Sequence, residues 1–386
     1  MPTTHASAVR DFVEARLGEA LADLDLLVSL ETPSRRRDLL DAALPRIEAY
    51  LVGRLGEPAR RARHDGGDLG DVLDLTWAGD RGAGQVLSLA HYDTVWPEGT
   101  LADWPLRRDD DVLTGPGVLD MKVGIVQTVW MVLALRELGV PHPDVRLLLT
   151  PDEEIGSRAG RPHLEAAARD ALVTLITEPS AGGSVKTRRK GMVFADVTVH
   201  GVESHAGLDP DAGASAVHEL ARLVPLLAAL ADPERQTTVN VGTISGGTGR
   251  NVVAGRATCE VDVRIQDPAE EERVVRALEA LEVVDERCRL EVVIDRNRPP
   301  MNPTAHTDRL LALVRVAGAD LGVEVGDRPV GGASDGNFVA ALGLPVLDGL
   351  GGIGAGPHAR HEHILVSGIA RQTALLAGVV EQLAQG

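Results

Sequence analysis

The chain has 386 residues, with 39 lysines and arginines against 57 aspartates and glutamates, and a formal net charge of -18. This acidic balance argues against nucleic acids and anionic membranes as partners, because both carry negative charge themselves. The length suits two domains, and with 44% hydrophobic but only 2% aromatic residues, Leu, Val and Ala must fill the core.

The sequence favours a cytoplasmic protein. Its two cysteines, Cys259 and Cys288, fit neither a metal-binding spacing nor a disulfide framework, which favours a reducing compartment. The N-terminus lacks the basic segment and clean apolar run of a signal peptide. No apolar run is expected to approach the roughly 18 residues that span a bilayer.

In chain order, helical patterns alternate with short apolar runs. The helical patterns span Ser7–Leu30, Asp38–Leu55, Lys122–Leu138 and Thr307–Leu321. The apolar runs, typical of buried strands, span Val86–Ala90, Val145–Thr150, Leu172–Thr177 and Pro345–Leu347. Near-continuous apolar strands with helices between them predict an α/β fold whose sheet is buried on both faces.

The pattern changes between residues 187 and 297. "MVFADVTVHG" alternates apolar and polar residues, as a half-exposed strand does. It is followed by a helix at Ala212–Leu230, the strands "TTVNVGTISG" and "TCEVDVRI", a helix at Pro268–Leu281 and the strand "RLEVVID". This order resembles the split βαβ sandwich. We therefore predict an α+β domain at 187–297, inserted into a larger domain formed by residues 1–186 and 298–386.

Charged residues or histidines follow each predicted core strand. His91 and Asp93 follow "VLSLA", Glu153 and Glu154 follow "VRLLLT", Glu178 follows "LVTLIT", and His358 follows "LPVLDGLGGIGAG". In open α/β sheets, ligands bind beyond the carboxyl ends of the strands. Asp120, in the glycine-rich "TGPGVLDMKVG", could complete the group. Two histidines and three carboxylates suit zinc or a similar divalent ion.

Each of these features has a plainer reading when taken alone. Asp120 could be an ordinary N-cap of the following helix. His91-x-Asp93 could be a surface turn, Glu153-Glu154 a solvated loop, and His358 an exposed histidine. Their joint occurrence favours the metal site, because cations would make a cluster of like-charged carboxylates favourable.

Several motifs together resemble the di-zinc aminoacylase/carboxypeptidase family, which includes acetylornithine deacetylase, succinyl-diaminopimelate desuccinylase and glutamate carboxypeptidase. The motifs are "SLAHYDTVWPEG", "GPGVLDMKVG", "LLLTPDEEIGS", "TEPS", "GVESHAG", "GGASDGNFVAALGLPVLDGLG" and "GPHARHEHI". They cover nearly the whole chain in the family's order and look most like the glutamate carboxypeptidase branch. The resemblance implies a zinc-peptidase-like catalytic domain with a central mixed, mostly parallel sheet, and a ferredoxin-like lid and dimerisation domain.

The resemblance also implies roles for the residues in these motifs. His91, Asp120 and Glu178 would hold one Zn2+, and Asp120, Glu154 and His358 would hold the second, with Co2+ or Mn2+ as alternatives. Asp93 matches the carboxylate that orients the ligand imidazole. Glu153 matches the general base of an amide hydrolase, and no Ser or Cys nucleophile is evident.

Residues of the predicted inserted domain match family positions near the substrate. His205 matches a histidine that reaches across a homodimer and polarises the scissile carbonyl, although a core or surface histidine is the alternative. Asn251 and Arg264 match lid residues close to the substrate. The "GGTGRN" stretch around Asn251 lacks the Gly-Lys-Ser/Thr ending of a phosphate-binding loop, so we discount that interpretation.

Two basic residues bear on the substrate. Arg298 matches an arginine that holds the α-carboxylate of the released amino acid, and Lys186 matches a lysine for a second carboxylate. A surface arginine beside a proline turn and a solvated strand edge are the alternatives. The resemblance implies release of a C-terminal amino acid, glutamate, from an N-acyl or peptidyl substrate. The rival hypotheses are a deacylase or dipeptidase with a non-glutamate substrate, and a binding protein without catalysis, which would have no use for Glu153.

Overall fold

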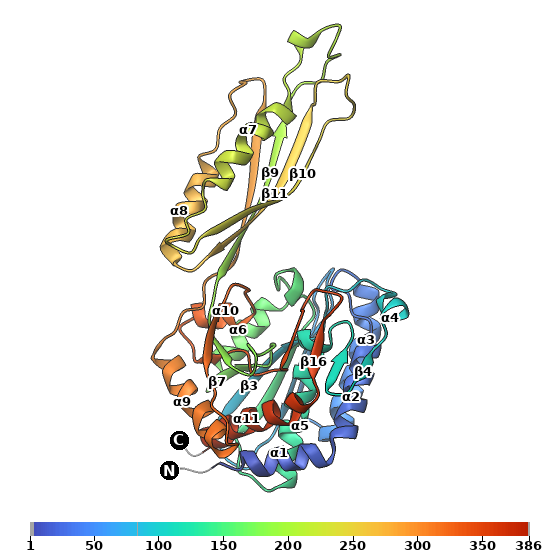
Figure 1. Cartoon of the computed structure of the whole chain (residues 1–386), viewed down its shortest axis with the longest axis vertical. Helices are drawn as coiled ribbons and strands as arrows, with labels where there is room; N and C mark the ends of the chain where they lie inside the picture. The colour runs from blue at the N-terminus through green and yellow to red at the C-terminus, as the bar shows by residue number, and fades with distance from the viewer. Residues whose placement is uncertain (1–3, 83, 385–386) are drawn as a thin grey trace. The chain divides into compact units, whose positions relative to one another are not determined.

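A computed structural model describes residues 4–82 and 84–384 of the chain (Figure 1). The chain divides into two compact units. Unit 1 contains residues 1–188, 302–330 and 334–386, and unit 2 contains residues 189–301 and 331–333. Residues 331–333 of unit 2 lie outside the range 187–297 that the sequence predicts for the inserted domain. Each unit has a hydrophobic core of its own.

Unit 1 is built on a six-stranded sheet of order β1-β2-β6-β3-β7-β14. Its strands are β1 (Arg60–His64), β2 (Val72–Trp77), β3 (Gln85–His91), β6 (Asp144–Thr150), β7 (Val173–Ile176) and β14 (Val346–Leu347). The pairs β3–β6, β3–β7 and β7–β14 are parallel, whereas β2 is antiparallel to both of its neighbours. The predicted α/β fold with a mixed, mostly parallel sheet is confirmed, and the ends of the predicted core strands lie within one residue of β3, β6, β7 and β14.

Helices surround this sheet. They are α1 (Ala6–Ala15), α2 (Leu17–Ser29), α3 (Arg37–Leu55), α4 (Thr100–Asp103), α5 (Val123–Glu137), α6 (Arg161–Arg169), α9 (Ala305–Asp320), α10 (Gly336–Ala341) and α11 (Ser367–Leu383). Helices α1, α5 and α11 pack together, α6 packs with α10, and both α5 and α6 contact the central strand β3. Covering helices explain why β2, β3, β6 and β7 are almost entirely buried.

The prediction of one helix over Ser7–Leu30 is wrong, because the helix breaks at Arg16. This residue leaves the helical region with a φ of −116°, which separates α1 from α2. Helix α1 packs on α11, while α2 packs on α5 and the turn before it. A continuous amphipathic pattern cannot reveal that its first half packs mainly on α11, whereas its second half packs on α5 and the turn before it.

One stretch of unit 1 has the length and mean hydropathy of a membrane span, although Asp120 and Lys122 interrupt its apolar run. The stretch Val118–Glu137 contains 20 residues, is kinked at Asp120 and Met121, and has a mean hydropathy of 1.6 over an 18-residue window. However, 89% of that window is buried inside the protein. Its apolar side chains belong to the core of unit 1, where α5 packs against α1, α3 and α11.

Two small sheets bring distant loops of unit 1 together. One has the order β15-β16-β5-β4, with β4 (Arg107–Asp109), β5 (Val112–Thr114), β15 (Gly354–Ala355) and β16 (His363–Leu365). The other pairs β8 (Val185–Arg189) with β13 (Asp327–Val330). The first sheet places the chain around residue 360 beside the turn at Val118–Lys122 that precedes α5.

Unit 2 is a four-stranded antiparallel sheet of order β10-β11-β9-β12 with two helices. Its elements are β9 (Gly191–His200), α7 (Ala216–Ala228), β10 (Thr238–Gly246), β11 (Arg256–Ile265), α8 (Pro268–Glu279) and β12 (Arg289–Arg298). The strand and helix order is the predicted one. Helix α7 begins later than predicted, because Ser215 caps it by accepting a hydrogen bond from the backbone N–H of His218.

Candidate active site

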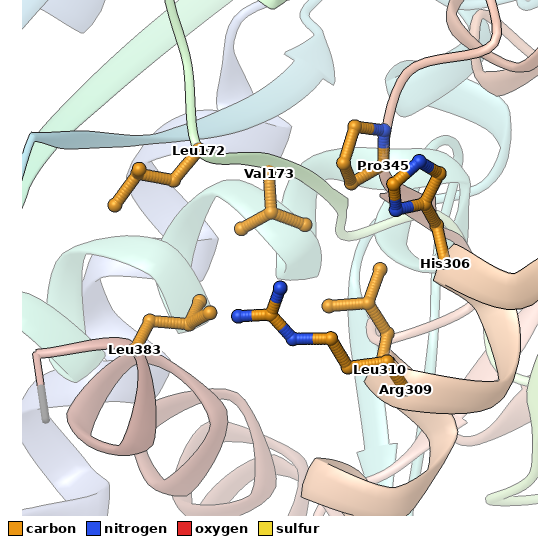
Figure 2. Close-up of a pocket in the computed structure, with 7 residues that line it drawn as sticks. All are labelled: Leu172, Val173, His306, Arg309, Leu310, Pro345 and Leu383. Atoms are coloured by element: carbon orange, nitrogen blue, oxygen red, sulfur yellow. The ribbon is translucent and has the colours of Figure 1, made fainter. Parts of the chain in front are cut away.

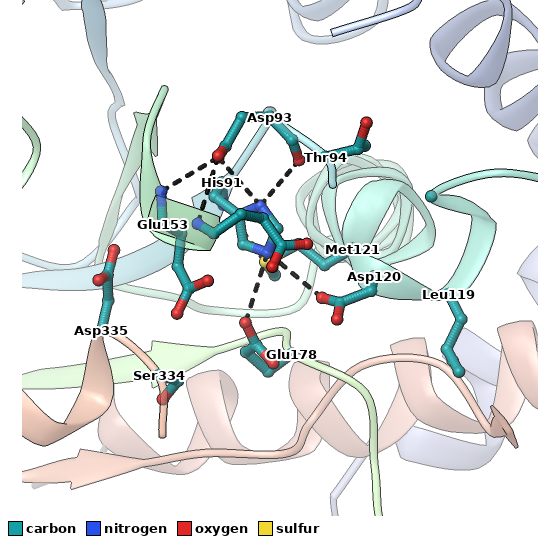
Figure 3. A network of polar contacts seen from close by, with 12 residues as sticks. His91, Asp93, Thr94, Leu119, Asp120, Met121, Glu153, Glu178, Ser334 and Asp335 are labelled. Carbon is teal, nitrogen blue, oxygen red and sulfur yellow. Dashed lines mark hydrogen bonds and ion pairs between the residues drawn. The ribbon is translucent and has the colours of Figure 1, made fainter. Parts of the chain in front are cut away.

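His91 ends the buried strand β3, and its side chain is only 1% exposed. Its Nδ1 lies 3.0 Å from the backbone oxygen of Asp93 and 3.3 Å from Asp93 Oδ1. Nδ1 therefore carries the proton, and Nε2 is left for another partner. Figure 3 shows the carboxylates of Asp120 and Glu178 on the Nε2 side of the ring. The surface-turn reading of His91-x-Asp93 does not hold, since both residues are buried.

The carboxylate of Asp93 also holds the turn that carries two further candidates. Asp93 accepts hydrogen bonds from the backbone N–H of Glu153 at 3.2 Å and of Glu154 at 3.3 Å, and from Ser34 Oγ at 2.7 Å. The backbone positions of Glu153 and Glu154 are thus fixed relative to His91. The pair is not a solvated loop, because the Glu153 residue is 8% exposed and the Glu154 side chain 5%.

Asp120 lies between the two candidate histidines. Its Oδ1 is 3.3 Å from His91 Nε2, and its Oδ2 is 3.3 Å from His358 Nε2. Asp120 does not cap α5, whose N-cap is Lys122 without a side-chain cap bond. Asp120 therefore presents one carboxylate oxygen to each of the two imidazoles.

The remaining carboxylates divide between the two histidines. Glu178 Oε1 lies 3.5 Å from His91 Nε2, and Glu154 Oε2 lies 2.9 Å from His358 Nε2. His91, Glu153 and Glu178 offer ligand atoms that all lie within 4.8 Å of one another, and so do His91, Asp120 and Glu154. Glu153 is therefore close enough to the group to act on a molecule bound there.

The electrostatics of the cluster favour positive charge. Burial and the negative charge of Asp120 raise the pKa of Glu154 to about 7. Hydrogen bonds to Asp120 and Glu154 raise the pKa of His358 to about 11. Burial lowers the pKa of His91, but hydrogen bonds to Asp120, Asp93 and Glu178 outweigh it and raise that pKa well above its usual value. These shifts show that the clustered carboxylates favour a positive charge beside them, which a cation would supply.

The residues fit two divalent ions. Mixed imidazole and carboxylate donors are a ligand set that zinc accepts. Among the described residues, Oε1 of Glu154 is a buried oxygen without a hydrogen-bond partner, which a cation could satisfy. His91, Asp120 and Glu178 would form one group of ligands, and Asp120, Glu154 and His358 the other.

Glu362 supports the site and was not anticipated from the sequence. Its buried carboxylate accepts hydrogen bonds from the backbone N–H of Gly117, Leu119 and Asp120 at 3.1, 2.9 and 3.1 Å. It also accepts one from Nε1 of Trp96 at 2.9 Å. The only signal available was its position four residues after His358, which does not indicate these partners.

In unit 2, the structure brings His205 and Asn251 together. A β-bridge joins His205 to Val252, and the N–H of Ala206 donates to the backbone oxygen of Asn251 at 3.0 Å. Nδ1 of His205 accepts hydrogen bonds from the N–H of Gly207 at 3.1 Å and of Leu208 at 3.0 Å. The proton of the neutral ring therefore sits on Nε2, which is exposed as a donor.

Arg264 and Arg298 lie near the opposite end of the same sheet. Both pair in register with Met192, Arg264 from β11 and Arg298 from β12. Arg264 is bonded to Asp262, with Nε–Oδ1 at 2.6 Å and Nη2–Oδ2 at 2.7 Å. Arg298 is buried. Within one copy of unit 2, His205 and Asn251 therefore lie at the end of the sheet opposite to Arg264 and Arg298.

Lys186 belongs to unit 1. Its backbone N–H donates to the backbone oxygen of Asp348 at 2.8 Å, which ties β8 to the end of β14. A different part of unit 1 contains a cavity of about 270 Å³ (Figure 2). Leu172, Val173 and Pro345 line it at the amino ends of β7 and β14, so it lies at the edge of the sheet away from His91.

Comparisons with known proteins show the family to which the chain belongs. Residues 87–382 match the sequence profile described as "Peptidase family M20/M25/M40". Carboxypeptidase G2 of Pseudomonas sp. (strain RS-16) is 30% identical over 376 residues, which cover 94% of this chain and 89% of the relative. Succinyl-diaminopimelate desuccinylase of Cupriavidus necator is 29% identical over 339 residues, which cover 80% and 85%.

The fold is also similar to that of a tripeptidase from Staphylococcus aureus, with a TM-score of 0.80 at 20% identity, covering 96% of this chain and 99% of that one. The family match spans most of the chain and includes the whole cluster around Asp120. The chain therefore belongs to peptidase family M20/M25/M40, and it is a metal-dependent hydrolase of amide bonds.

Proposed function

We propose that the chain is a di-zinc metallocarboxypeptidase that releases a C-terminal amino acid, glutamate, from N-acyl or peptidyl substrates. The observation that carries this proposal is Asp120, which presents one oxygen to each of two imidazoles at 3.3 Å. The similarity to carboxypeptidase G2 supports a carboxypeptidase. Two free, buried cysteines fit a reducing compartment, and we propose the cytoplasm.

The ligands would be shared between two Zn2+, with Co2+ or Mn2+ as alternatives. His91 and Glu178 would hold one ion, Glu154 and His358 the other, and Asp120 both. When bound, the ions would supply Lewis acidity at the amide carbonyl and make water acidic enough to ionise near neutral pH. Asp93 would keep His91 in the tautomer whose Nε2 faces the ions.

Glu153 would move the proton. Its carboxylate lies within reach of the His91 and Glu178 ligand atoms, and its backbone is held by Asp93. It would accept a proton from the attacking water and return it to the leaving nitrogen. Burial of Glu153 would limit the exchange of that proton with bulk solvent.

His205 would donate a hydrogen bond to the oxygen of the carbonyl under attack. Its Nε2–H is available for this role, because Nδ1 is occupied by two backbone N–H groups. In a single copy of unit 2, His205 and Asn251 lie at the end of the sheet away from Arg264 and Arg298. We therefore propose a homodimer in which His205 serves the partner's site.

Glutamate would need cations for its two carboxylates. We assign Arg298 to the α-carboxylate and Lys186 to the side-chain carboxylate, with Asn251 and Arg264 also close to the substrate. The Asp262 carboxylate already pairs with Arg264, so we expect Arg264 to position neighbouring groups more than to bind an anion alone.

The test is amino-acid release from N-acyl amino acids that share one acyl group and differ in the released residue. Zinc-loaded enzyme should release glutamate and aspartate well above alanine or lysine, and a chelator should stop release. Preferential release of neutral or basic residues would overturn the glutamate assignment in favour of a deacylase or dipeptidase. No release from any substrate would contradict the carboxypeptidase assignment.

A further inference from the structure

Three consecutive arginines, Arg35, Arg36 and Arg37, stand out in a chain with a formal charge of -18. Arg36 pairs with Asp38 at 2.7 Å and also with Glu98. Arg37 pairs with Asp41, Asp65 and Asp71 at 3.0 to 3.1 Å. These two side chains are accounted for by protein partners.

Arg35 differs from its neighbours. It is exposed, and the structure gives its guanidinium no hydrogen bond or ion pair with any residue in the described ranges 4–82 and 84–384. It lines a cavity of about 590 Å³ in unit 1. Glu154 and Ile155 line the same cavity, so the space borders the proposed metal centre.

The backbone on either side of this cavity is firmly held. Ser34 donates from Oγ to Asp93 Oδ2 at 2.7 Å and from its N–H to the oxygen of Thr94 at 3.2 Å. The N–H of Thr94 donates to the oxygen of Thr32 at 2.8 Å. The segment that carries Arg35 is therefore tied to the carboxylate that orients His91. The backbone therefore keeps Arg35 near the site, while the Arg35 side chain stays available to a ligand.

The cavity also has an apolar side. Pro33, Val95 and Pro97 line it, and the Val95 side chain is exposed. Of the two acidic residues in the lining, Glu98 is neutralised by Arg36, and Glu154 would be neutralised by a bound cation. Arg35 thus remains the uncompensated charge beside an apolar wall. This combination suits a short aliphatic group that ends in an anion.

We propose that this cavity binds the acyl half of the substrate and that Arg35 selects acyl groups ending in a carboxylate, such as an ω-carboxyacyl group or an acidic residue. This inference rests on the proposed function, since it takes the amide to be cleaved beside Glu154. The residues assigned to the released amino acid, Arg298 and Lys186, are not in the lining, which leaves the cavity to the other half of the substrate.

The test measures binding of the acyl products to zinc-loaded enzyme by calorimetry, with succinate and succinamate as probes. Each acid has one carboxylate for the metal centre, but only succinate has a second one for Arg35. Succinate should bind about three- to tenfold more tightly than succinamate to the wild type, and salt should reduce this preference. In Arg35→Gln the two affinities should become equal.

Arg46→Gln is the matched control, because Arg46 is exposed on α3 and does not line the cavity. It should keep the preference for succinate. Equal affinities in the wild type, a preference that survives in Arg35→Gln, or no binding of either acid would overturn the inference.

A parallel assay compares kcat/KM for N-succinyl-glutamate and N-succinamoyl-glutamate. The wild type should prefer the succinyl substrate by the same factor, and Arg35→Gln should show no preference. A failure of the proposed function is separable from a failure of this inference. The proposed function is tested by which amino acid is released. The calorimetry tests only the acyl group, because it measures binding without turnover.

Discussion

At the scale of single residues, Asp93 sets the relative positions of the candidate ligands and the proposed base. Its buried carboxylate lies beside His91 Nδ1 and accepts the backbone N–H groups of Glu153 and Glu154. One side chain therefore fixes the ring orientation of one ligand and the turn that holds another. All of the groups around the Asp93 side chain donate hydrogen bonds to it. A carboxylate, whose two oxygens only accept, therefore suits this position.

The role of Glu153 can be separated from metal binding. Glu153→Gln keeps the size of the side chain but removes its ability to accept a proton, so we expect the rate of amide hydrolysis to fall by about 10²–10⁴-fold. The number of zinc ions per chain, measured by elemental analysis, should not change. A variant that hydrolyses the amide at nearly the wild-type rate would rule out Glu153 as the base.

The sequence was sufficient to predict that His91, Glu154 and Glu178 lie close together, because each lies at or after the end of a strongly apolar strand whose carboxyl end meets the others at one edge of the sheet. It was not sufficient for Glu362. Three of the four groups that donate to that carboxylate are backbone N–H groups 242 to 245 residues away, and a backbone donor has no sequence signature. Arg35 was missed for a related reason, since only the structure distinguishes it from Arg36 and Arg37.

At the scale of elements, long apolar strands were predictable and short polar ones were not. The four core strands could be placed within one residue because a sheet buried on both faces leaves a continuous apolar run. Strands such as β4 (Arg107–Asp109), exposed along its length, carry no such pattern. Strand β4 forms because β5 supplies its backbone partners, and β5 in turn pairs with β16.

Glu362 holds the turn that precedes α5, and its removal should affect the metal centre. In Glu362→Gln an amide N–H2 replaces one acceptor and faces backbone donors, so the turn carrying Asp120 should lose its fixed position. We expect zinc affinity to fall about 10- to 100-fold, measured by competition with a chelator. Excess zinc should restore much of the activity, while circular dichroism should show a folded protein. Unchanged zinc affinity would contradict this positioning role.

Within unit 2, Glu270 links the start of α8 to the segment just before β10. Its buried carboxylate accepts hydrogen bonds from Arg273, Arg235 and Thr237, and these hold its pKa at about 2, against burial. The folded state therefore gains stability from this group above the usual pKa of 4.5, and this gain is lost as the pH falls towards 2.

Glu270→Gln should lower the free energy of unfolding by about 2 kcal/mol at pH 7, because it leaves two arginines without their anion. The difference from the wild type should shrink as the pH falls below 4.5. Urea unfolding at several pH values measures this, with the exposed Glu282→Gln as the control. A difference independent of pH would contradict the electrostatic origin.

At the scale of the whole molecule, the candidate metal ligands all come from unit 1, whereas His205 belongs to unit 2. Unit 1 is discontinuous in sequence, and the two stretches that supply ligands, 91–178 and 358, flank the chain of unit 2. The change from near-continuous apolar strands to alternating ones is the sequence pattern from which we predict a separate domain over this segment. The attachment of residues 331–333 to unit 2 depends on hydrogen bonds from Arg189, which no local pattern predicts.

The proposed action of His205 across a homodimer can be tested by mixing two inactive variants. His205→Ala and Glu153→Gln should each have little activity as homodimers. After mixing and subunit exchange, half of the dimers should be mixed, and one of their two sites would contain both wild-type residues. Activity should therefore return to about a quarter of the wild-type level per site. No recovery, despite exchange verified by mass spectrometry, would contradict action in trans.

The most direct test of the central claim is the rate of amino-acid release as metal-free enzyme is titrated with zinc. The account predicts a negligible rate without metal and a plateau at two zinc ions per chain, because Asp120 presents one oxygen to each of two ligand groups. A full rate after complete removal of metal would contradict the account.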